Sequence, residues 1–233
     1  MSMALPCSSC CCCCPWISFP SREREPLNTQ RSSQSHQGIE RAHINKEKPL
    51  KMKRVSMPKI DTLFTNIAET FNKQQGDCVA LREAIQGLKE TFCCSPASSL
   101  SVCIEKIQQE HRACNVQVQM EGYRFWLAMR QKDVPEKLKW AQQQVGELNR
   151  ATLGVISVET KLQEMIQSVL QSQDKLMEKV KAANPEYLDQ IRVEGNLQEN
   201  IQEMCLAQQF SKQYTEEAKN VLKEMSNSVG FTL

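Results

Sequence analysis

Residues 60–92 carry a hydrophobic repeat with alternating steps of four and three residues, which limits the possible fold more than any other feature. The repeat runs unbroken through Ile60, Phe64, Ile67, Phe71, Gln74, Cys78, Leu81, Ile85, Leu88 and Phe92. This spacing places the side chains on one stripe of a helix and is typical of a coiled coil. Pro58 suits the first helical turn, where its missing N–H has no helical partner. Pro96 disfavours helix at Ser95, so we expect the helix to end within residues 93–99.

Three further helices are predicted beyond this loop. The second covers about residues 100–131; its segment VQVQM (116–120) alternates like a strand, but it is isolated within a helical pattern and is interpreted as helix. The third and longest covers residues 138–183, where the three-four rhythm of apolar positions holds until Asn184-Pro185 breaks it. The fourth covers about residues 186–227 and has two apolar stripes, so it can contact more than one neighbour.

The predicted fold class is therefore all-α, built from long coiled-coil helices. Short links between helices of similar length favour antiparallel hairpins. We expect one helical hairpin over residues 58–132 and a longer one over residues 133–233. The two hairpins either pack together as an elongated four-helix bundle or splay apart, and the periodicity does not choose between these arrangements.

Residues 1–57 are predicted to form a disordered N-terminal arm. Much of this segment is polar and lacks a period, so it offers little apolar surface to offset the entropy of ordering. The arm holds nine Lys and Arg against four Asp and Glu, including the basic stretch KEKPLKMKR at 46–54. That stretch suits either a nuclear-import, lipid or nucleic-acid patch or a solvated arm, and the solvated arm is favoured. A shorter form starting at Met52 or Met57 would lack most or all of the arm.

Twelve cysteines are present, and six of them cluster near the start of the chain. Five are consecutive: Cys10, Cys11, Cys12, Cys13 and Cys14. Clustered cysteines can be S-acylated and tether a protein to a membrane, although an incidental run is the favoured interpretation. Several later cysteines occupy apolar positions of helical patterns, where a free thiol acts as a small hydrophobe. A reducing intracellular compartment, cytoplasmic or nuclear, is therefore expected. No run of 18 apolar residues predicts a transmembrane helix.

The sequence predicts no enzyme, cofactor or small-molecule substrate. It has no glycine-rich phosphate loop, nucleophile elbow or H-E-x-x-H pair. His111 and Cys114 share a helix face and could meet Cys103 and Cys78, but a core position is favoured over a metal site. Residues 58–233 hold twenty Lys and Arg against twenty-three Asp and Glu, so nucleic-acid binding is not expected.

Aromatic residues concentrate around the predicted loop before the third helix. Tyr123, Trp126 and Trp140 lie within 18 residues of one another, together with Phe125. Tyrosine and tryptophan dominate the energetics of many protein interfaces, so this group is a candidate partner-binding hot spot. An equally acceptable interpretation is a cap that closes the end of the bundle core.

Four seam positions are polar where a coiled coil favours apolar residues: Gln74, Thr152, Glu159 and Gln173. Polar seam residues lower stability but fix helix register and partner choice. We therefore expect Thr152, Glu159 and Gln173 to face helices of another protein or of a second copy. The alternative places them half exposed at the edge of an internal bundle.

The helical part resembles, in a general sense, subunits of multi-protein coiled-coil assemblies. This resemblance implies a non-catalytic subunit or scaffold of the cytoskeletal, centrosomal, kinetochore or meiotic chromosome type, which acts through helix–helix binding. Its expected partners are coiled-coil proteins or a second copy of the chain. The alternative is a membrane-peripheral adaptor anchored by acylation of the cysteine run, and a membrane partner is expected only in that case.

Overall fold

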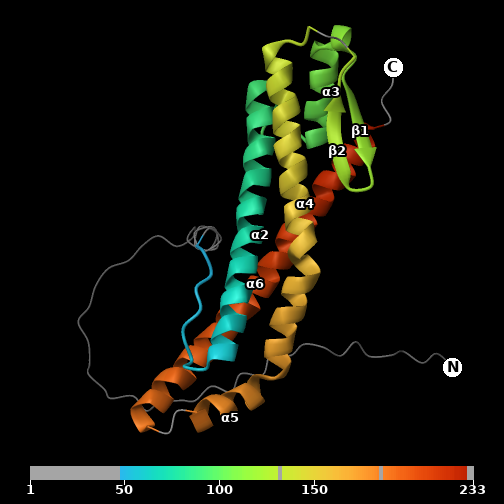
Figure 1. Ribbon diagram of the computed structural model, residues 1–233. Helices are drawn as coiled ribbons and strands as arrows, with labels where there is room; N and C mark the ends of the chain where they lie inside the picture. The colour runs from blue at the N-terminus through green and yellow to red at the C-terminus, as the bar shows by residue number, and fades with distance from the viewer. Residues whose placement is uncertain (1–47, 131–132, 184–185, 230–233) are drawn as a thin grey trace, which may run out of the picture. The chain divides into compact units, whose positions relative to one another are not determined.

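The computed structural model describes residues 48–130, 133–183 and 186–229, and most of them are helical, as predicted (Figure 1). The elements in chain order are α2 (Pro58–Thr91), α3 (Leu100–Glu110), the 3-10 helix η1 (Arg112–Cys114), β1 (Gln117–Glu121), β2 (Arg124–Ala128), α4 (Glu136–Gln171), α5 (Gln173–Ala183) and α6 (Tyr187–Ser228). Residues 1–47 of the predicted disordered arm, with the cysteine run that is a candidate for acylation, lie outside the described residues.

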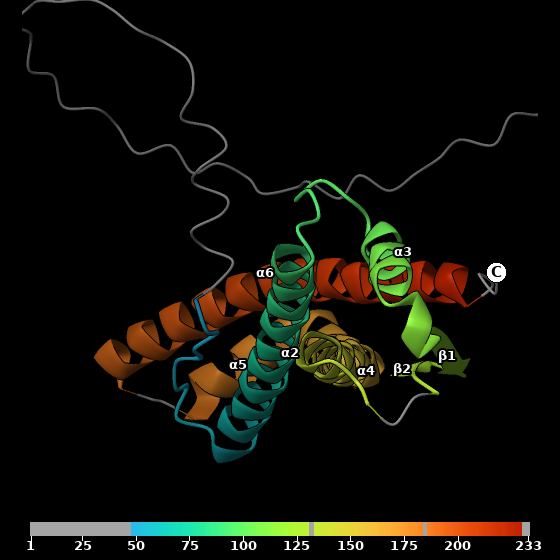
Figure 2. The ribbon, with the colours of Figure 1, turned by 90° about the horizontal axis from the view of Figure 1, so that it is seen from above.

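Helix α2 begins at Pro58, as the sequence predicts, and ends at Thr91, just before the predicted range of residues 93–99. Pro58 occupies its first turn, and most of the predicted seam is buried, including Phe64, Ile67 and Leu88. α2 packs chiefly along α4, which runs in the opposite direction, and α6 crosses both helices (Figure 1, Figure 2). The main core of the described chain therefore lies between α2, α4 and α6.

The helix predicted over residues 100–131 is wrong beyond Glu110. After η1, the chain forms an antiparallel hairpin in which Glu121 pairs with Arg124 around a two-residue turn. Gly122 opens this turn with a φ of 60°, a conformation that glycine adopts without the steric cost of a side chain. The alternation of VQVQM is thus that of a real strand, because RFWLA supplies a partner strand two residues later.

The hairpin and α3 pack onto the longer helices. Phe125 and Leu127 of β2 are buried, and β2 packs along α4, where the Asn149 Oδ1 accepts a hydrogen bond from the Phe125 N–H at 3.0 Å. α3 packs more against α6 than against α2, and the Glu224 carboxylate of α6 accepts the N–H of Ser101 at 3.1 Å. The predicted hairpin over residues 58–132 therefore lacks its second long helix.

The third predicted helix is interrupted. α4 ends at Gln171 and α5 begins at Gln173, whereas a continuous helix over residues 138–183 was expected. Ser172 lies at the break, and its hydroxyl donates to the Ser168 carbonyl at 2.6 Å. α5 then packs against the beginning of α6, as Figure 1 shows. The fourth helix, α6, spans Tyr187–Ser228, close to the predicted range.

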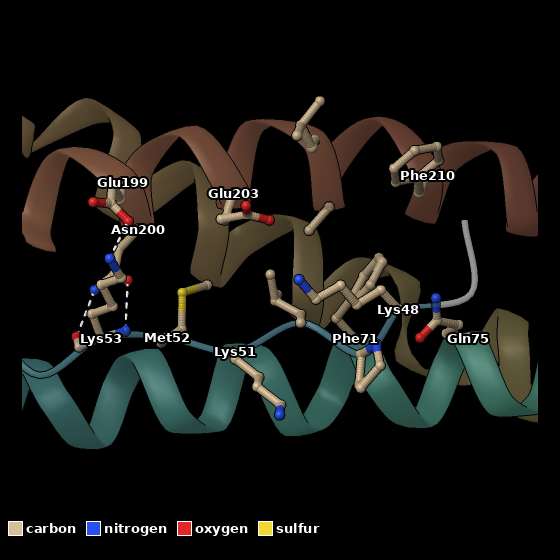
Figure 3. A pocket seen from close by; sticks show the side chains of 14 residues that line it. Lys48, Lys51, Met52, Lys53, Phe71, Gln75, Glu199, Asn200, Glu203 and Phe210 are labelled. Atoms are coloured by element: carbon tan, nitrogen blue, oxygen red, sulfur yellow. Dashed lines mark hydrogen bonds and ion pairs between the residues drawn. The ribbon is translucent and has the colours of Figure 1, made fainter. Parts of the chain in front are cut away.

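An extended segment precedes α2 and is called here the strap (residues 48–57). The prediction that nothing in residues 1–57 joins a core is wrong for the strap, because Leu50 is 7% exposed and Val55 is 0% exposed. The strap lies alongside α2 and α6 (Figure 3). Its two buried residues lie among lysines and an arginine in the sequence. The composition of the segment is therefore polar, although its two apolar side chains join the core.

Candidate functional site

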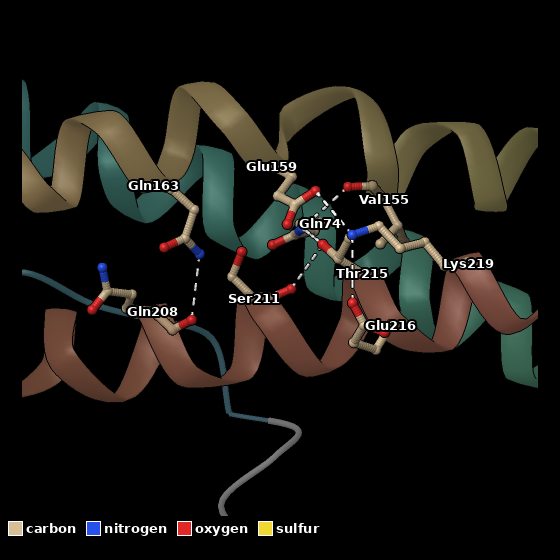
Figure 4. A network of polar contacts seen from close by, with 9 residues as sticks. All are labelled: Gln74, Val155, Glu159, Gln163, Gln208, Ser211, Thr215, Glu216 and Lys219. Carbon is tan, nitrogen blue, oxygen red and sulfur yellow. Dashed lines mark hydrogen bonds and ion pairs between the residues drawn. The ribbon is translucent and has the colours of Figure 1, made fainter. Parts of the chain in front are cut away.

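A polar layer lies inside the junction of α2, α4 and α6 (Figure 4). The Gln74 side chain is 0% exposed, and its Nε2 donates to the Val155 carbonyl at 3.1 Å and to the Thr215 Oγ1 at 3.4 Å. The Thr215 hydroxyl in turn donates to the Ser211 carbonyl at 3.0 Å. The Gln74 Oε1 and the Ser211 Oγ are buried without a hydrogen-bond partner. This layer connects three helices at one level and favours a single register between them.

Thr152 also lies in the interior. Its side chain is 0% exposed, and its hydroxyl donates to the Leu148 carbonyl of its own helix at 2.7 Å. The expectation that Thr152 faces another chain is corrected, because this chain buries the residue completely and satisfies its hydroxyl. Gln74 is likewise an interior residue, so its place in the seam needs no external partner.

The other two polar seam residues lie closer to solvent. The Glu159 side chain is 27% exposed, and its carboxylate lies 4.0 Å from the Lys219 Nζ of α6. Gln173 is exposed at the start of α5. The structure therefore does not bring Thr152, Glu159 and Gln173 onto one face, and only Glu159 and Gln173 remain accessible to a partner.

The three predicted aromatic residues occupy two locations. Tyr123 and Trp126 are on the outer face of the hairpin, 66% and 39% exposed, and the Trp126 Nε1 donates to the Gln119 Oε1 at 3.0 Å. Trp140 of α4 is half-buried and packs over Gly87 of α2, where an added Cβ would lie 3.3 Å from the indole ring. Trp140 thus serves the α2–α4 contact, whereas Tyr123 and Trp126 stay available at the surface.

A more exposed apolar surface was missed by the sequence reasoning. The α6 patch consists of Tyr187, Leu188 and Ile191, whose side chains are 73%, 79% and 52% exposed. Leu188 and Ile191 belong to one of the two apolar stripes predicted for the fourth helix. The buried stripe instead begins at Val193, which is 0% exposed. The spacing of 187, 188 and 191 places the α6 patch on one face of the first helical turns.

A groove of about 450 Å³ adjoins the strap between α2 and α6 (Figure 3). Phe71 of α2 and Leu206 and Phe210 of α6 supply apolar walls, and Glu203 supplies a carboxylate. Leu206 is 47% exposed. Local spacing predicts only a second apolar stripe on the fourth helix, whereas the groove also needs the strap as its third wall.

An ion pair links α2 to α6, and a buried thiol lies in α3. Arg82 of α2 donates to both carboxylate oxygens of Glu217 on α6, at 2.8 and 2.7 Å, and this hydrogen bonding raises the pKa of Arg82. Burial, with a contribution from Cys94, raises the pKa of the Cys103 thiol to about 12, so it stays protonated at neutral pH. In the described ranges, no three His, Cys, Asp or Glu side chains gather to hold a metal ion. This holds also for His111, Cys114, Cys103 and Cys78, for which a core position is favoured over a metal site.

Comparison of the chain with protein-family models, curated proteins and solved structures finds no match in any of the three. Within the described ranges, no helix is both long and apolar enough to cross a membrane.

Proposed function

We propose that this chain is a non-catalytic subunit or scaffold of a multi-protein assembly and that it acts by binding helices of other proteins. The observation that carries this proposal is the α6 patch. Tyr187, Leu188 and Ile191 each leave more than half of the side chain exposed, on one face of a 42-residue helix. Clustered exposed apolar side chains mark interaction sites more often than isolated ones do.

The form of the α6 patch suits an amphipathic helix as its partner. Tyr187 and Ile191 stand at i and i+4, and Leu188 and Ile191 at i and i+3, the spacings with which one helix contacts another. Asp189 and Arg192 flank the patch and pair with each other at 3.0 Å. An apolar centre with a charged rim is the usual composition of a protein interface. Assemblies of the cytoskeletal, centrosomal, kinetochore or meiotic chromosome type, which rely on coiled-coil helices, are the proposed setting.

Introducing charge into the α6 patch tests the proposal. Leu188→Glu combined with Ile191→Glu places two carboxylates in the α6 patch, and Val102→Glu on α3 is the matched control because Val102 is also a helical aliphatic residue, 49% exposed. Proteins that co-purify with the wild-type chain should be quantified for each variant, and circular dichroism should check folding. The proposal expects specific partners to be lost only from the double variant. An unchanged partner set with a folded double variant would refute it.

The alternative proposal, a membrane-peripheral adaptor, rests on the five consecutive cysteines at residues 10–14. Acyl-exchange labelling of the wild-type chain, compared with a variant carrying serine at these five positions, tests it. Labelling that is equal in the two proteins would remove its support.

A further inference from the structure

The strap is held by side-chain amides that recognise its backbone. The Leu50 N–H donates to the Asn72 Oδ1 at 2.7 Å, and the Asn72 Nδ2 donates back to the Leu50 carbonyl at 3.0 Å. The Asn72 amide thereby makes both hydrogen bonds that a residue on a neighbouring antiparallel strand would make. This contact requires an extended backbone and does not involve the side chain at position 50.

The same two-point contact recurs on α6. The Lys53 N–H donates to the Asn200 Oδ1 at 2.8 Å, and the Asn200 Nδ2 donates to the Lys53 carbonyl at 2.7 Å (Figure 3). One turn earlier on α6, the Asn196 Nδ2 donates to the Arg54 carbonyl at 2.8 Å. Asn200 is 1% exposed, so its amide is committed to this contact. Two helices thus bind one extended segment as an additional strand would.

Side chains add selectivity to this backbone recognition. Leu50 and Val55 are buried, Met52 is half-buried, and Lys51 and Lys53 point outward. Lys53 forms an ion pair with Glu199 of α6, and Glu203 also lines the groove. The preferred ligand is therefore an extended segment with apolar residues at the positions of Leu50 and Val55 and basic residues between them.

The connection between the strap and α2 is short and strained. Only Ser56 and Met57 separate Val55 from Pro58, the first residue of α2. Ser56 has a φ of 60°, in the left-handed region that a serine rarely adopts. The Asp61 Oδ1 accepts the Val55 N–H at 2.8 Å and fixes the reversal. Short hinges under strain favour the exchange of a terminal segment between two copies of a chain.

We propose that the surface of α2 and α6 that holds the strap is a receptor for an extended basic-apolar segment and that it binds the strap of a second copy. A foreign peptide would have to displace a tethered strap that is present at high effective concentration. Exchange between two copies replaces each lost strap by an identical one and lets Ser56 leave its strained conformation. The product is a symmetric dimer in which the two α2 N-termini lie close together. This inference goes beyond the proposed function and does not depend on the α6 patch.

Two hinge variants of the full chain should move the dimer equilibrium in opposite directions. Ser56→Pro fixes φ near −65°, so the strap cannot fold back and dimer should form. Ser56→Gly accepts the positive φ, which removes the strain from the monomer. The dimer dissociation constant, measured by analytical ultracentrifugation, should be higher for Ser56→Gly than for wild type by roughly tenfold or more, because each dimer releases the strain of two Ser56 residues.

A groove variant shows whether the Ser56→Pro dimer uses the proposed contacts. Adding Asn200→Ala removes both hydrogen bonds to Lys53 and should return Ser56→Pro to monomer, whereas Asn220→Ala, an exposed asparagine on the same helix, should leave the dimer intact. A synthetic peptide of residues 48–55 should also dissociate the Ser56→Pro dimer, which keeps the test decisive if Asn200→Ala impairs folding. A monomeric Ser56→Pro, or a dimer that resists the peptide, would overturn the proposal.

Discussion

Replacing Gln74 by leucine should stabilise the protein, although it removes a residue with two hydrogen bonds. The bond from Gln74 Nε2 to the Val155 carbonyl is 3.1 Å, and the bond to the Thr215 Oγ1 is long at 3.4 Å. Their combined net loss is about 1 kcal/mol, since the Thr215 hydroxyl keeps its bond to the Ser211 carbonyl.

The leucine variant also removes a buried polar atom that has no partner. The Gln74 Oε1 is unsatisfied, and leaving such an atom buried costs about 1–3 kcal/mol. Leucine of similar volume adds apolar burial as well. The net gain should be about 1–2 kcal/mol, which corresponds to roughly 2–4 °C in Tm per kcal/mol for a domain of this size.

Thermal and urea unfolding followed by circular dichroism provide the assay. Thr152→Val is the matched control, because the Thr152 hydroxyl bonds only to a carbonyl of its own helix, and its loss should change the free energy of unfolding by about 1 kcal/mol or less. A loss of 1 kcal/mol or more in Gln74→Leu would show that the polar layer stabilises the fold and that the reasoning is wrong.

Three further perturbations follow from individual residues. Exposed Cys205 should react with iodoacetamide at pH 8 in the folded protein, whereas Cys103, which is buried and has a pKa raised to about 12, should react only on unfolding. Peptide mapping measures the alkylation of both cysteines, and labelling of Cys103 in the folded protein would contradict its burial. Burial raises the pKa of Asp77, so its carboxylate destabilises the folded state once the pH exceeds the pKa of the unfolded chain. Asp77→Asn should therefore raise Tm at pH 7, and this gain should vanish at lower pH. A gain in Tm that does not depend on pH would exclude this cause. Gly122→Ala, at a φ of 60°, should lower the free energy of unfolding by about 1–2 kcal/mol in chemical denaturation. Gly146→Ala should stabilise the protein, because an added Cβ on α4 meets open space there. Equal effects of the two substitutions would argue against the turn geometry.

The parts of the fold that depend on local periodicity could be predicted from the sequence. The 4-3 spacing from Ile60 to Phe92 gives α2 closely, and the break at Asn184-Pro185 separates α5 from α6. The alternation of VQVQM does not predict the hairpin by itself, because a strand needs a partner. RFWLA, which begins after Gly122, contained the second half of the signal.

The strap and the polar layer depend on contacts that are distant in sequence. Leu50 pairs with an asparagine 22 residues away, and Lys53 pairs with one 147 residues away. The spacing of Asn196 and Asn200 shows that they share a helix face, but not what they bind. Likewise, the sequence pattern shows polar residues at seam positions 74 and 152, and this pattern is the same whether the neighbouring helix belongs to this chain or to another one. Local sequence cannot separate these cases.

Site-specific photo-crosslinking at the α6 patch tests the central claim most directly. A photoreactive amino acid at position 188 should form adducts in cells with helical segments of particular partner proteins, and the same amino acid at position 220, exposed on the same helix, should not. Mass spectrometry of the adducts identifies the partner segment. Adducts at position 188 that map to an amphipathic helix are the predicted result, whereas no adduct at 188, or the same adducts at both positions, would contradict the claim that this chain acts by binding helices.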